Sequence, residues 1–384
     1  MVSNSVQKIS HYLSPVFKGG GEVLLADLIK RQSLDKKNKI ILILGAENEY
    51  MEKELQNYFI NIIKLRYLKS QFSYSKIETI LRAIIQYIWL NLVLTFNHFD
   101  IFHSHSFPAQ YLLIPKILNF FKIKKTKYIH TKHIDAKRKL FKSILWIIAL
   151  KLNDNITFVS RSSRESAFRS FDSKKLKVIG NPVSGIFFDI GDERIRNLNN
   201  ITLNQFGNYK ELKICVISRL VKGKGHLELI NFISKFIQKN SQFSNITISI
   251  LGDGPLREKI ENEINLLNLN KIIFMFGLVE QQKVLDVIKN SDFAIHPSTN
   301  EGLSISCLQY LASCLPTFAK QYGPSFDVFE GNTLYYDNYD SFEECFLKFS
   351  SKKTLSNISY SFLGSRDKAK WSKIVQEYDS LYKS

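Results

Sequence analysis

Glu301 and Gln309 are a pair of side chains whose types and spacing could bind a ligand. They lie in NEGLSISCLQY (300–310), where a loop after an apolar run leads into a helical pattern. Free N–H groups at a helix start favour an anion, and residues about two turns apart come near one face. One elongated ligand could therefore contact both side chains, and the alternative is a buried helix with two polar ends. The backbone candidates beside them are Gly302, Leu303, Ser304 and Ile305.

A second candidate site is a pair of cations in VISRLVKGKGH (216–226). Arg219 directly follows a predicted strand, and Lys224 lies five residues later between Gly223 and Gly225. Arginine offers planar two-point contacts and lysine a compact charge, so together they suit a diphosphate. The Walker pattern G-x-x-x-x-G-K-[ST] is absent. The alternative interpretation is two exposed loop cations that bind nothing.

Three glycines in FKGGGEVLLADLIK (17–30) separate a predicted strand from a predicted helix. Gly20 and Gly21 would let the backbone approach a ligand, and the helix start would offer N–H groups to an anion. A tight turn without a ligand explains the same residues equally well.

Four histidines follow two predicted strands. His103 and His105 share one face in FDIFHSHSF, and His130 and His133 follow in YIHTKHID. Histidine at such a position can bind a phosphate or a sugar hydroxyl without acid–base chemistry. A metal site would need further ligands that the sequence does not clearly supply, so we expect none. A structural role is the alternative for each histidine.

Strand-like and helix-like segments alternate along the chain. Runs such as KIILILG (39–45) and LKICVIS (212–218) have strand character, whereas EVLLADLIKRQ (22–32) and GHLELINFISKFI (225–237) have helical character. This alternation favours an α/β fold with doubly wound parallel sheets, whose ligands bind beyond the carboxyl ends of the strands. The other predicted strands are 6–14, 100–106, 127–131, 156–160, 176–180, 246–252, 272–277 and 292–298.

Residues 181–211 interrupt this alternation with Pro, Gly and many Asn, and we interpret them as a connection between domains. We expect one Rossmann-like domain over 1–185 and a second over 186–360. Residues 361–384 would form a last helical segment that packs back towards the N-terminal domain. Two such domains would face each other across a central cleft, each supplying one wall of the site.

Nearly the whole net positive charge lies in the first half of the chain. Residues 1–185 hold 30 Lys and Arg against 13 Asp and Glu, whereas the rest hold 23 against 22. The basic residues cluster at 62–71, 121–127 and 136–151, the last as an amphipathic pattern suited to a membrane surface. An anionic membrane surface is one predicted partner, and a solvated basic face is the alternative. We expect no nucleic-acid partner, because no recognisable module for it is present.

Composition favours a cytoplasmic protein. The first residues have no apolar core of signal-peptide length, and the most apolar stretch, 80–94, is too short and too polar to span a membrane. The cysteines form no C-x-x-C pair, which is typical of reduced thiols. We expect a peripheral protein on the inner face of the cytoplasmic membrane.

The second half resembles a family 4 retaining glycosyltransferase with the GT-B fold, among the glycosyl transferases of group 1. The matching segments are SRLVKGKG (218–225), LGDGPLREKIE (251–261), FMFGLVEQQKV (274–284) and AIHPSTNEGLSISCLQYLASCLP (294–316). The first half matches more loosely through GGGE (19–22), DIFHSHS (100–106), IHTKHID (129–135) and VSRSSRE (159–165).

The resemblance implies the class of sugar donor and the role of each site residue. The donor would be a nucleotide-diphosphate sugar, UDP- or GDP-linked, and its sugar would pass with retention to a glycan or lipid-linked acceptor, without a metal or other cofactor. Arg219 and Lys224 would hold the diphosphate, assisted by the amides after Gly302. Glu301 would accept hydrogen bonds from the sugar hydroxyls.

The resemblance also assigns residues of the first half. His133 would stand near the sugar and the leaving group, and His105 would lie on the same acceptor or sugar side. Gly20 and Gly21 would approach the phosphates or the acceptor. The resemblance thus places Glu301 and His133 with the two cations in the catalytic set.

Gln309 departs from the family pattern, because the second acidic position of the E-x7-E motif falls there. That acid holds the ribose hydroxyls in the family. A neutral hydrogen bond contributes about 0.5–1.5 kcal/mol and a charged one about 1.5–3 kcal/mol, so glutamine costs roughly 1 kcal/mol. We therefore expect a modest loss of affinity and no loss of chemistry.

We expect an enzyme that builds bacterial lipopolysaccharide, O-antigen or capsule. One alternative is a non-catalytic subunit that binds a partner or a membrane, with Gln309 marking a degenerate site. The retained Glu301, Arg219 and Lys224 argue against it. Another is an epimerase or phosphorylase on the same fold, and no pyridoxal-type lysine motif supports it.

Overall fold

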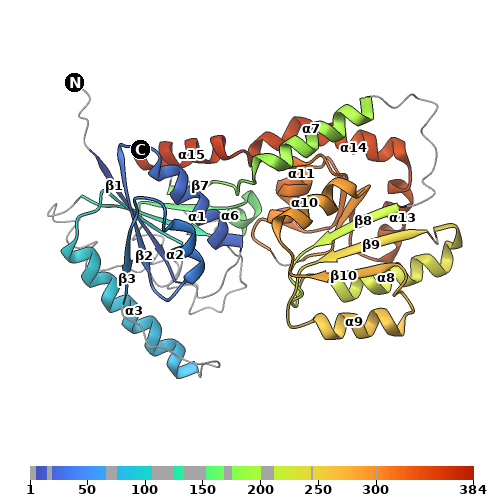
Figure 1. The fold of residues 1–384 in the computed structure, drawn as a ribbon, viewed down its shortest axis with the longest axis horizontal. Helices are drawn as coiled ribbons and strands as arrows, with labels where there is room; N and C mark the ends of the chain where they lie inside the picture. The colour runs from blue at the N-terminus through green and yellow to red at the C-terminus, as the bar shows by residue number, and fades with distance from the viewer. Residues whose placement is uncertain are drawn as a thin grey trace. The chain divides into compact units, whose positions relative to one another are not determined.

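The computed structural model describes residues 6–14, 20–65, 76–105, 125–133, 153–167, 175–199, 212–243, 245–299 and 301–384. The chain divides into two units. Unit 1 comprises Met1–Ile179 with Val375–Ser384, and unit 2 comprises Gly180–Ile374. Each unit is built on its own parallel sheet with helices beside it (Figure 1). The expected α/β architecture with two Rossmann-like sheets is confirmed.

Unit 1 holds a seven-stranded sheet in the order β3-β2-β1-β4-β5-β6-β7. Residues on β1 and β4 lie side by side, with His11 opposite His103 in the register. Successive side chains of a strand point to opposite faces, so these two histidines share one face. The strands are β1 (Gln7–Leu13), β2 (Asn38–Leu44), β3 (Asn61–Lys64), β4 (Ile101–Ser104), β5 (Lys127–Lys132), β6 (Asn155–Phe158) and β7 (Leu176–Val178).

Helices cover both faces of this sheet. On one face, α3 buries its inner side on a cluster that contains Tyr12, Ile41, Ile43, Phe102 and Tyr128. On the other face, Gln32 of α1 bonds His11, and Tyr382 of α15 bonds His103. The helices of unit 1 are α1 (Gly20–Ser33), α2 (Glu49–Leu55), α3 (Lys76–Phe96), α6 (Arg161–Ala167) and the greater part of α15 (Trp371–Lys383).

Unit 2 holds a six-stranded sheet in the order β10-β9-β8-β11-β12-β13. The strand order reverses between β8 and β11, which creates a topological switch point, the usual ligand site of an open α/β sheet. The strands are β8 (Leu212–Ile217), β9 (Ile246–Leu251), β10 (Ile273–Gly277), β11 (Phe293–His296), β12 (Thr317–Lys320) and β13 (Tyr335–Tyr336).

The helices of unit 2 lie on both sides of its sheet, with α8 and α9 on one side and α7, α10 and α11 on the other (Figure 1). They are α7 (Gly185–Asn199), α8 (His226–Lys239), η4 (Ser241–Phe243), α9 (Arg257–Leu266), α10 (Gln281–Asn290), α11 (Ile305–Ala312), α12 (Gly323–Phe329), α13 (Tyr339–Phe349), α14 (Lys352–Ser365) and η5 (Arg366–Ala369). The core between them is rich in phenylalanine, with Phe293, Phe318 and Phe346 fully buried.

The predicted strands are all present, with ends that differ by up to two residues. The prediction missed β3, β12 and β13, which are short, and β3 and β13 also lie at the edges of their sheets. A strand of two to four residues has too few positions to establish an alternating pattern.

The interpretation of residues 181–211 as an irregular connection is wrong for α7. Phe187 and Ile195 of α7 are buried in the core of unit 2. Gly191 in the middle of the helix faces a close neighbour, since a Cβ there would lie 2.4 Å from the carbonyl oxygen of Ala312. A glycine that permits close helix packing therefore looked like a helix breaker in the sequence.

Candidate functional site

The loops that follow β8 and β11 meet beside the switch point of unit 2. Gly225 has φ +74°, and a Cβ there would lie 2.1 Å from the carbonyl oxygen of Pro297. The amide of Thr299 donates to the carbonyl of Gly223 at 3.0 Å. Since only glycine combines a positive φ with this approach, the two glycines bring Lys224 against the β11–α11 loop.

Lys224 and Glu301 form an ion pair at this junction. Lys224 Nζ lies 2.6 Å from Glu301 Oε1, and the two side chains are only 12% and 14% exposed. His296 Nε2 lies 3.6 Å from the same carboxylate oxygen. Charged side chains are rarely buried to this extent unless they are paired. The ion pair therefore explains how both charges are accommodated at this site. The structure thus brings together two predicted site residues from loops that lie far apart in sequence.

Tyr322 holds the backbone of Glu301. The tyrosine hydroxyl donates to the carbonyl oxygen of Glu301 at 2.7 Å and accepts from its amide at 3.3 Å. These two bonds fix the backbone from which the Glu301 side chain extends to Lys224. Sequence reasoning missed Tyr322, because it follows β12, outside every motif considered.

Glu301 is an anion at neutral pH. Burial favours its neutral form, but His296 and Lys224 outweigh burial, so the pKa of Glu301 lies below its ordinary value of 4.5. Burial lowers the pKa of His296 below 6.5. The charge of Glu301 raises this pKa, and the charge of Lys224 lowers it, but burial has the larger effect. At neutral pH the positive charge beside Glu301 therefore belongs to Lys224.

Arg219, the other predicted cation, lies just beyond the end of β8 and is exposed. Among the residues that the structure describes, its side chain makes no ion pair. Its neighbour Ser218 bonds His226 Nε2 at 2.9 Å, and burial lowers the pKa of His226 to about 4. Arg219 is thus on the predicted loop and available to an anion, while Lys224 is already paired.

The amide set predicted after Gly302 needs a correction of register. The helix α11 starts at Ile305, and Ser304 is its N-cap, whose hydroxyl accepts from the amide of Cys307. Leu303 and Ser304 therefore precede the helix instead of forming its first turn. The loop is longer than expected, because the Ser304 side chain accepts from an amide of the first turn, so the helix begins only after this serine.

Gln309 lies in α11 and is half-buried. Its backbone carbonyl accepts the amide of Ser313, as in a regular helix. Within the part of the chain described, its side-chain amide has no protein partner. This amide is therefore free to bind a ligand, although Glu301 lies outside the helix and shares no helical face with it.

Gly20 and Gly21 form the first turn of α1. A Cβ at Gly21 would meet nothing within 4 Å, so no part of the protein needs a glycine there for space. The residues just before, 15–19, lie outside the described residues. The predicted backbone approach to a ligand at Gly20 and Gly21 stays a prediction.

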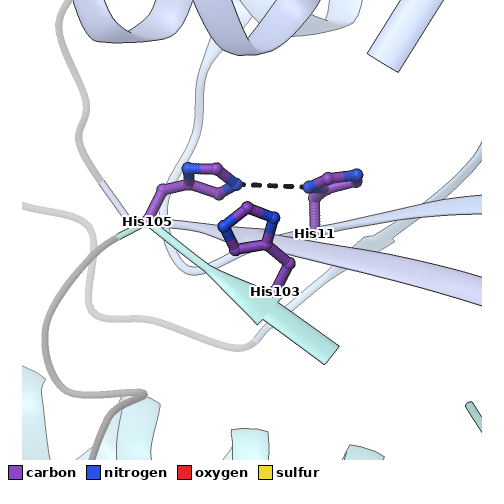
Figure 2. Close-up of side chains that lie close together, drawn as sticks. All are labelled: His11, His103 and His105. Carbon is purple, nitrogen blue, oxygen red and sulfur yellow. Dashed lines mark hydrogen bonds between the residues drawn. The ribbon is translucent and has the colours of Figure 1, made fainter. Parts of the chain in front are cut away.

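Four histidines of unit 1 gather on one face of its sheet. His11 Nδ1 lies 3.2 Å from His105 Nε2, and His105 Nδ1 lies 3.3 Å from His133 Nε2. The ring of His103 lies beside that of His105, with centroids 4.1 Å apart. Figure 2 shows His11 and His105 edge to edge, with His103 next to them. His130 differs, because it bonds Ser104 at 2.8 Å.

A metal ion is poorly matched to these rings. His11, His103 and His105 bring ring nitrogens within 4.8 Å of one another. Both nitrogens of His103 are already hydrogen-bonded, Nδ1 to the Tyr382 hydroxyl at 2.8 Å and Nε2 to the Thr131 hydroxyl at 2.6 Å. Two rings remain, whereas zinc sites use three or four protein ligands. The absence of a metal stays a prediction.

The sequence reasoning missed His11, Gln32 and His296 as members of these clusters. His296 could have been noticed, because it ends β11 five residues before Glu301. His11 and Gln32 carry no such signal, since they meet only through the pairing of β1 with β4 and the packing of α1.

Comparison with known proteins gives two family matches. The family described as "Glycosyl transferases group 1" matches residues 202–356, and "Glycosyltransferase Family 4" matches residues 18–184. The glycosyltransferase MJ1059 of Methanocaldococcus jannaschii is 27% identical over 57% of this chain. That match spans about half of the relative's own length, 55%.

Solved glycosyltransferases share the fold. HepE of Anabaena, in complex with UDP and glucose, has a TM-score of 0.71 at 15% identity, covering 98% of this chain and 100% of its own. The lipopolysaccharide outer core galactosyltransferase WaaB has a TM-score of 0.69 at 15% identity, covering 97% and 98%. At these identities the likeness concerns the arrangement of the chain.

Proposed function

Because the chain belongs to the family 4 glycosyltransferases and has the GT-B fold, we propose that it transfers a sugar from a nucleotide-diphosphate donor to a glycan or lipid-linked acceptor. The transfer retains the anomeric configuration and needs no metal or other cofactor. HepE, solved with UDP and glucose, supports the donor class. The acceptor we propose belongs to bacterial lipopolysaccharide, O-antigen or capsule, and WaaB, a lipopolysaccharide outer core galactosyltransferase, supports the first of these.

The observation that carries this proposal is the Lys224–Glu301 ion pair beside the switch point of unit 2. A nucleotide-sugar donor carries an anionic diphosphate and sugar hydroxyls, which can bind Lys224 and Glu301 respectively. The diphosphate takes the place of the carboxylate at Lys224, and the released carboxylate of Glu301 accepts hydrogen bonds from the sugar. The ion pair therefore holds both side chains ready in the absence of the ligand.

The chemistry follows from the charges. As the bond from C1 of the sugar to the phosphate oxygen breaks, the diphosphate gains negative charge, which Arg219 and Lys224 stabilise. The acceptor hydroxyl forms the new bond to C1 on the same face, and its proton passes to the departing phosphate oxygen. Glu301 orients the sugar, His133 contacts a sugar hydroxyl, and Gln309 binds the ribose. No side chain is assigned as a nucleophile.

The proposal is tested with a panel of UDP- and GDP-sugars. A donor should raise the melting temperature of the protein, and an acceptor glycan should then release nucleoside diphosphate and yield a glycoside. The proposal is wrong if no nucleoside diphosphate stabilises the fold. Stabilisation without turnover would instead favour the non-catalytic subunit.

Substitution Gln309→Glu is expected to tighten binding of the nucleoside diphosphate by up to about tenfold, because a charged acceptor binds the ribose hydroxyls more strongly. The turnover number should change little, since this side chain acts away from C1. Calorimetry with UDP and GDP measures the change. A fall in affinity would show that Gln309 uses its N–H donors, and that the site differs from the family pattern in kind.

Membrane association is the second part of the proposal. The basic clusters expected at 62–71 and 121–127 lie largely outside the described residues, and 136–151 lies wholly outside. The described surface offers a different feature, an apolar stripe on α3 at four-residue spacing. It consists of Ile84, Ile88, Leu92 and Phe96, which are 41–81% exposed. No described helix is both long and apolar enough to cross a bilayer.

We assign this α3 stripe, with the basic first half of the chain, to contact with an anionic bilayer surface on the cytoplasmic side. The double variant Ile88→Gln, Leu92→Gln should lower binding to vesicles of anionic phospholipid by at least about tenfold, because each side chain contributes about 1–2 kcal/mol. Sedimentation measures the bound fraction. Leu266→Gln, at an exposed leucine of unit 2, is the control. Equal losses in the two variants would remove the stripe from the proposal.

A further inference from the structure

Three histidines of unit 1 form a continuous hydrogen-bonded row. His11 belongs to β1, and His105 and His133 directly follow the neighbouring strands β4 and β5. The links are His11 Nδ1 to His105 Nε2 at 3.2 Å, drawn in Figure 2, and His105 Nδ1 to His133 Nε2 at 3.3 Å. We call these three residues the histidine row. Every link joins one ring nitrogen to another, so each link needs one donor and one acceptor.

Gln32 of α1 fixes the direction at one end of the row. Its side-chain oxygen Oε1 lies 2.8 Å from His11 Nε2, and its Nε2 donates to the Tyr382 hydroxyl at 3.3 Å. A carbonyl oxygen only accepts, so the proton of His11 is on Nε2. Gln32, His11 and Tyr382 are all buried, which protects this arrangement from water.

Burial also keeps the row uncharged. Burial lowers the pKa of His11 and of His133 to about 4, and that of His105 well below its usual value. A neutral imidazole carries a single N–H, so its second nitrogen is an acceptor. With the proton of His11 on Nε2, its Nδ1 accepts from His105 Nε2–H. His105 Nδ1 then accepts from His133 Nε2–H, and the lone pair on Nδ1 of His133 is used by no link of the row.

We infer that Gln32, His11 and His105 are positioning residues that hold His133 in its Nε2–H tautomer, with Nδ1 directed as an acceptor to a hydroxyl of the substrate. The inference rests on the proposed function, in which His133 contacts the sugar. The tautomer predicts that the substrate group at Nδ1 of His133 is an uncharged hydroxyl that donates a hydrogen bond. A phosphate oxygen at that place would be repelled, because it would face the lone pair of Nδ1. Among the described residues, Nδ1 of His133 has no protein partner that could take this place.

His103 is a neighbour of the row and not a link in it. Its two ring nitrogens bond Tyr382 and Thr131, and Thr131 bonds the hydroxyl of Thr157 at 2.6 Å. The Tyr382 hydroxyl also accepts from Gln32 Nε2, so it helps to set the orientation of the Gln32 amide. The Thr157 hydroxyl lies at the far end of this second chain, and its loss should leave the direction of the histidine row unchanged, which supplies a control.

The test is the tautomeric state of His133 in the full chain. Long-range ¹H–¹⁵N spectra of protein labelled with ¹⁵N-histidine, at pH 7, should show His133 with a protonated Nε2 and an unprotonated Nδ1. The variant His133→Asn assigns the signal by its disappearance. A protonated Nδ1, or a doubly protonated ring, overturns the inference. The readout needs no turnover, so failure of the sugar-transfer assay would affect the proposed function and not this result.

Two variants then test the anchor. Gln32→Met removes the acceptor at similar volume, and the His133 signals should move towards a mixture of tautomers, with kcat lowered about threefold to tenfold, the value of one neutral hydrogen bond. Thr157→Val should keep the wild-type tautomer, because it removes a hydroxyl of the second chain that does not contact Gln32. Equal spectra for wild type and Gln32→Met would overturn the role of Gln32. If Gln32→Met does not fold, the wild-type spectrum still decides the tautomer.

A ligand titration tests the chemical class. Inorganic sulfate carries no proton at pH 7, so it offers only acceptor oxygens and should leave the ¹⁵Nδ1 signal of His133 in place. A shift of that signal towards the protonated range on adding sulfate would show that His133 binds an anion, and would overturn the assignment to a hydroxyl.

Discussion

Replacing Lys224 by alanine is expected to lower kcat/KM for the sugar donor by about 10²–10³-fold, the usual cost of removing one group that stabilises a developing anion. Lys224 is the cation held 2.6 Å from Glu301 in the loop after β8. The diphosphate carries more negative charge in the transition state than in the bound donor, so the lost cation affects turnover as well as binding. Initial rates of nucleotide release measure the change.

The same loop offers a matched control in Lys222. This lysine is exposed and lies two residues before Lys224, so Lys222→Ala removes an equal charge from almost the same position. A change of less than about twofold is expected, because exposed charges are screened by solvent. If both variants lose activity equally, the loop acts through the summed electrostatic field of its charges. The proposed contact between Lys224 and the diphosphate is then wrong.

Most strands of both sheets could be predicted because a parallel strand between helices is a short apolar run, which is a local property. The helix α7 could not, since its pattern contains Gly191, and only the neighbouring Ala312 explains why glycine is needed there. The start of α11 was misplaced by two residues for a similar reason. The Ser304 hydroxyl satisfies an amide of the first turn, and the sequence shows serines at both 304 and 306.

The candidate site was predicted residue by residue but not as a set of contacts. The sequence indicates Lys224 and Glu301 separately, because each lies in a loop with a characteristic spacing. Their pairing depends on the adjacency of β8 and β11, which neighbour each other in the sheet although three strands apart in order. Tyr322 and His11 depend wholly on such adjacency, so no reading of spacing could have included them.

Replacing Glu301 by alanine is the other change with a large expected effect, a fall of at least about 10²-fold in kcat, because the carboxylate orients the sugar as its bond to the phosphate breaks. Its pKa lies below 4.5, owing to His296 and Lys224 outweighing burial, so the group that acts at neutral pH is the anion. Glu301→Gln keeps the shape and removes the charge, and it should lose less than Glu301→Ala. Glu344→Gln, which breaks the exposed ion pair with Lys348, is the control.

Binding of UDP or GDP separates the two partners of the ion pair. In the free protein Glu301 competes with the diphosphate for Lys224, so Glu301→Ala releases the lysine, and the affinity for nucleoside diphosphate should be unchanged or higher. Lys224→Ala should weaken the same affinity. Glu301→Ala also leaves a nearly buried lysine unpaired, which should lower the melting temperature, and added nucleoside diphosphate should restore most of that loss by supplying the missing anion. If Glu301→Ala instead weakens nucleotide binding as much as Lys224→Ala does, the glutamate serves only to position the lysine, and its contact with the sugar is wrong.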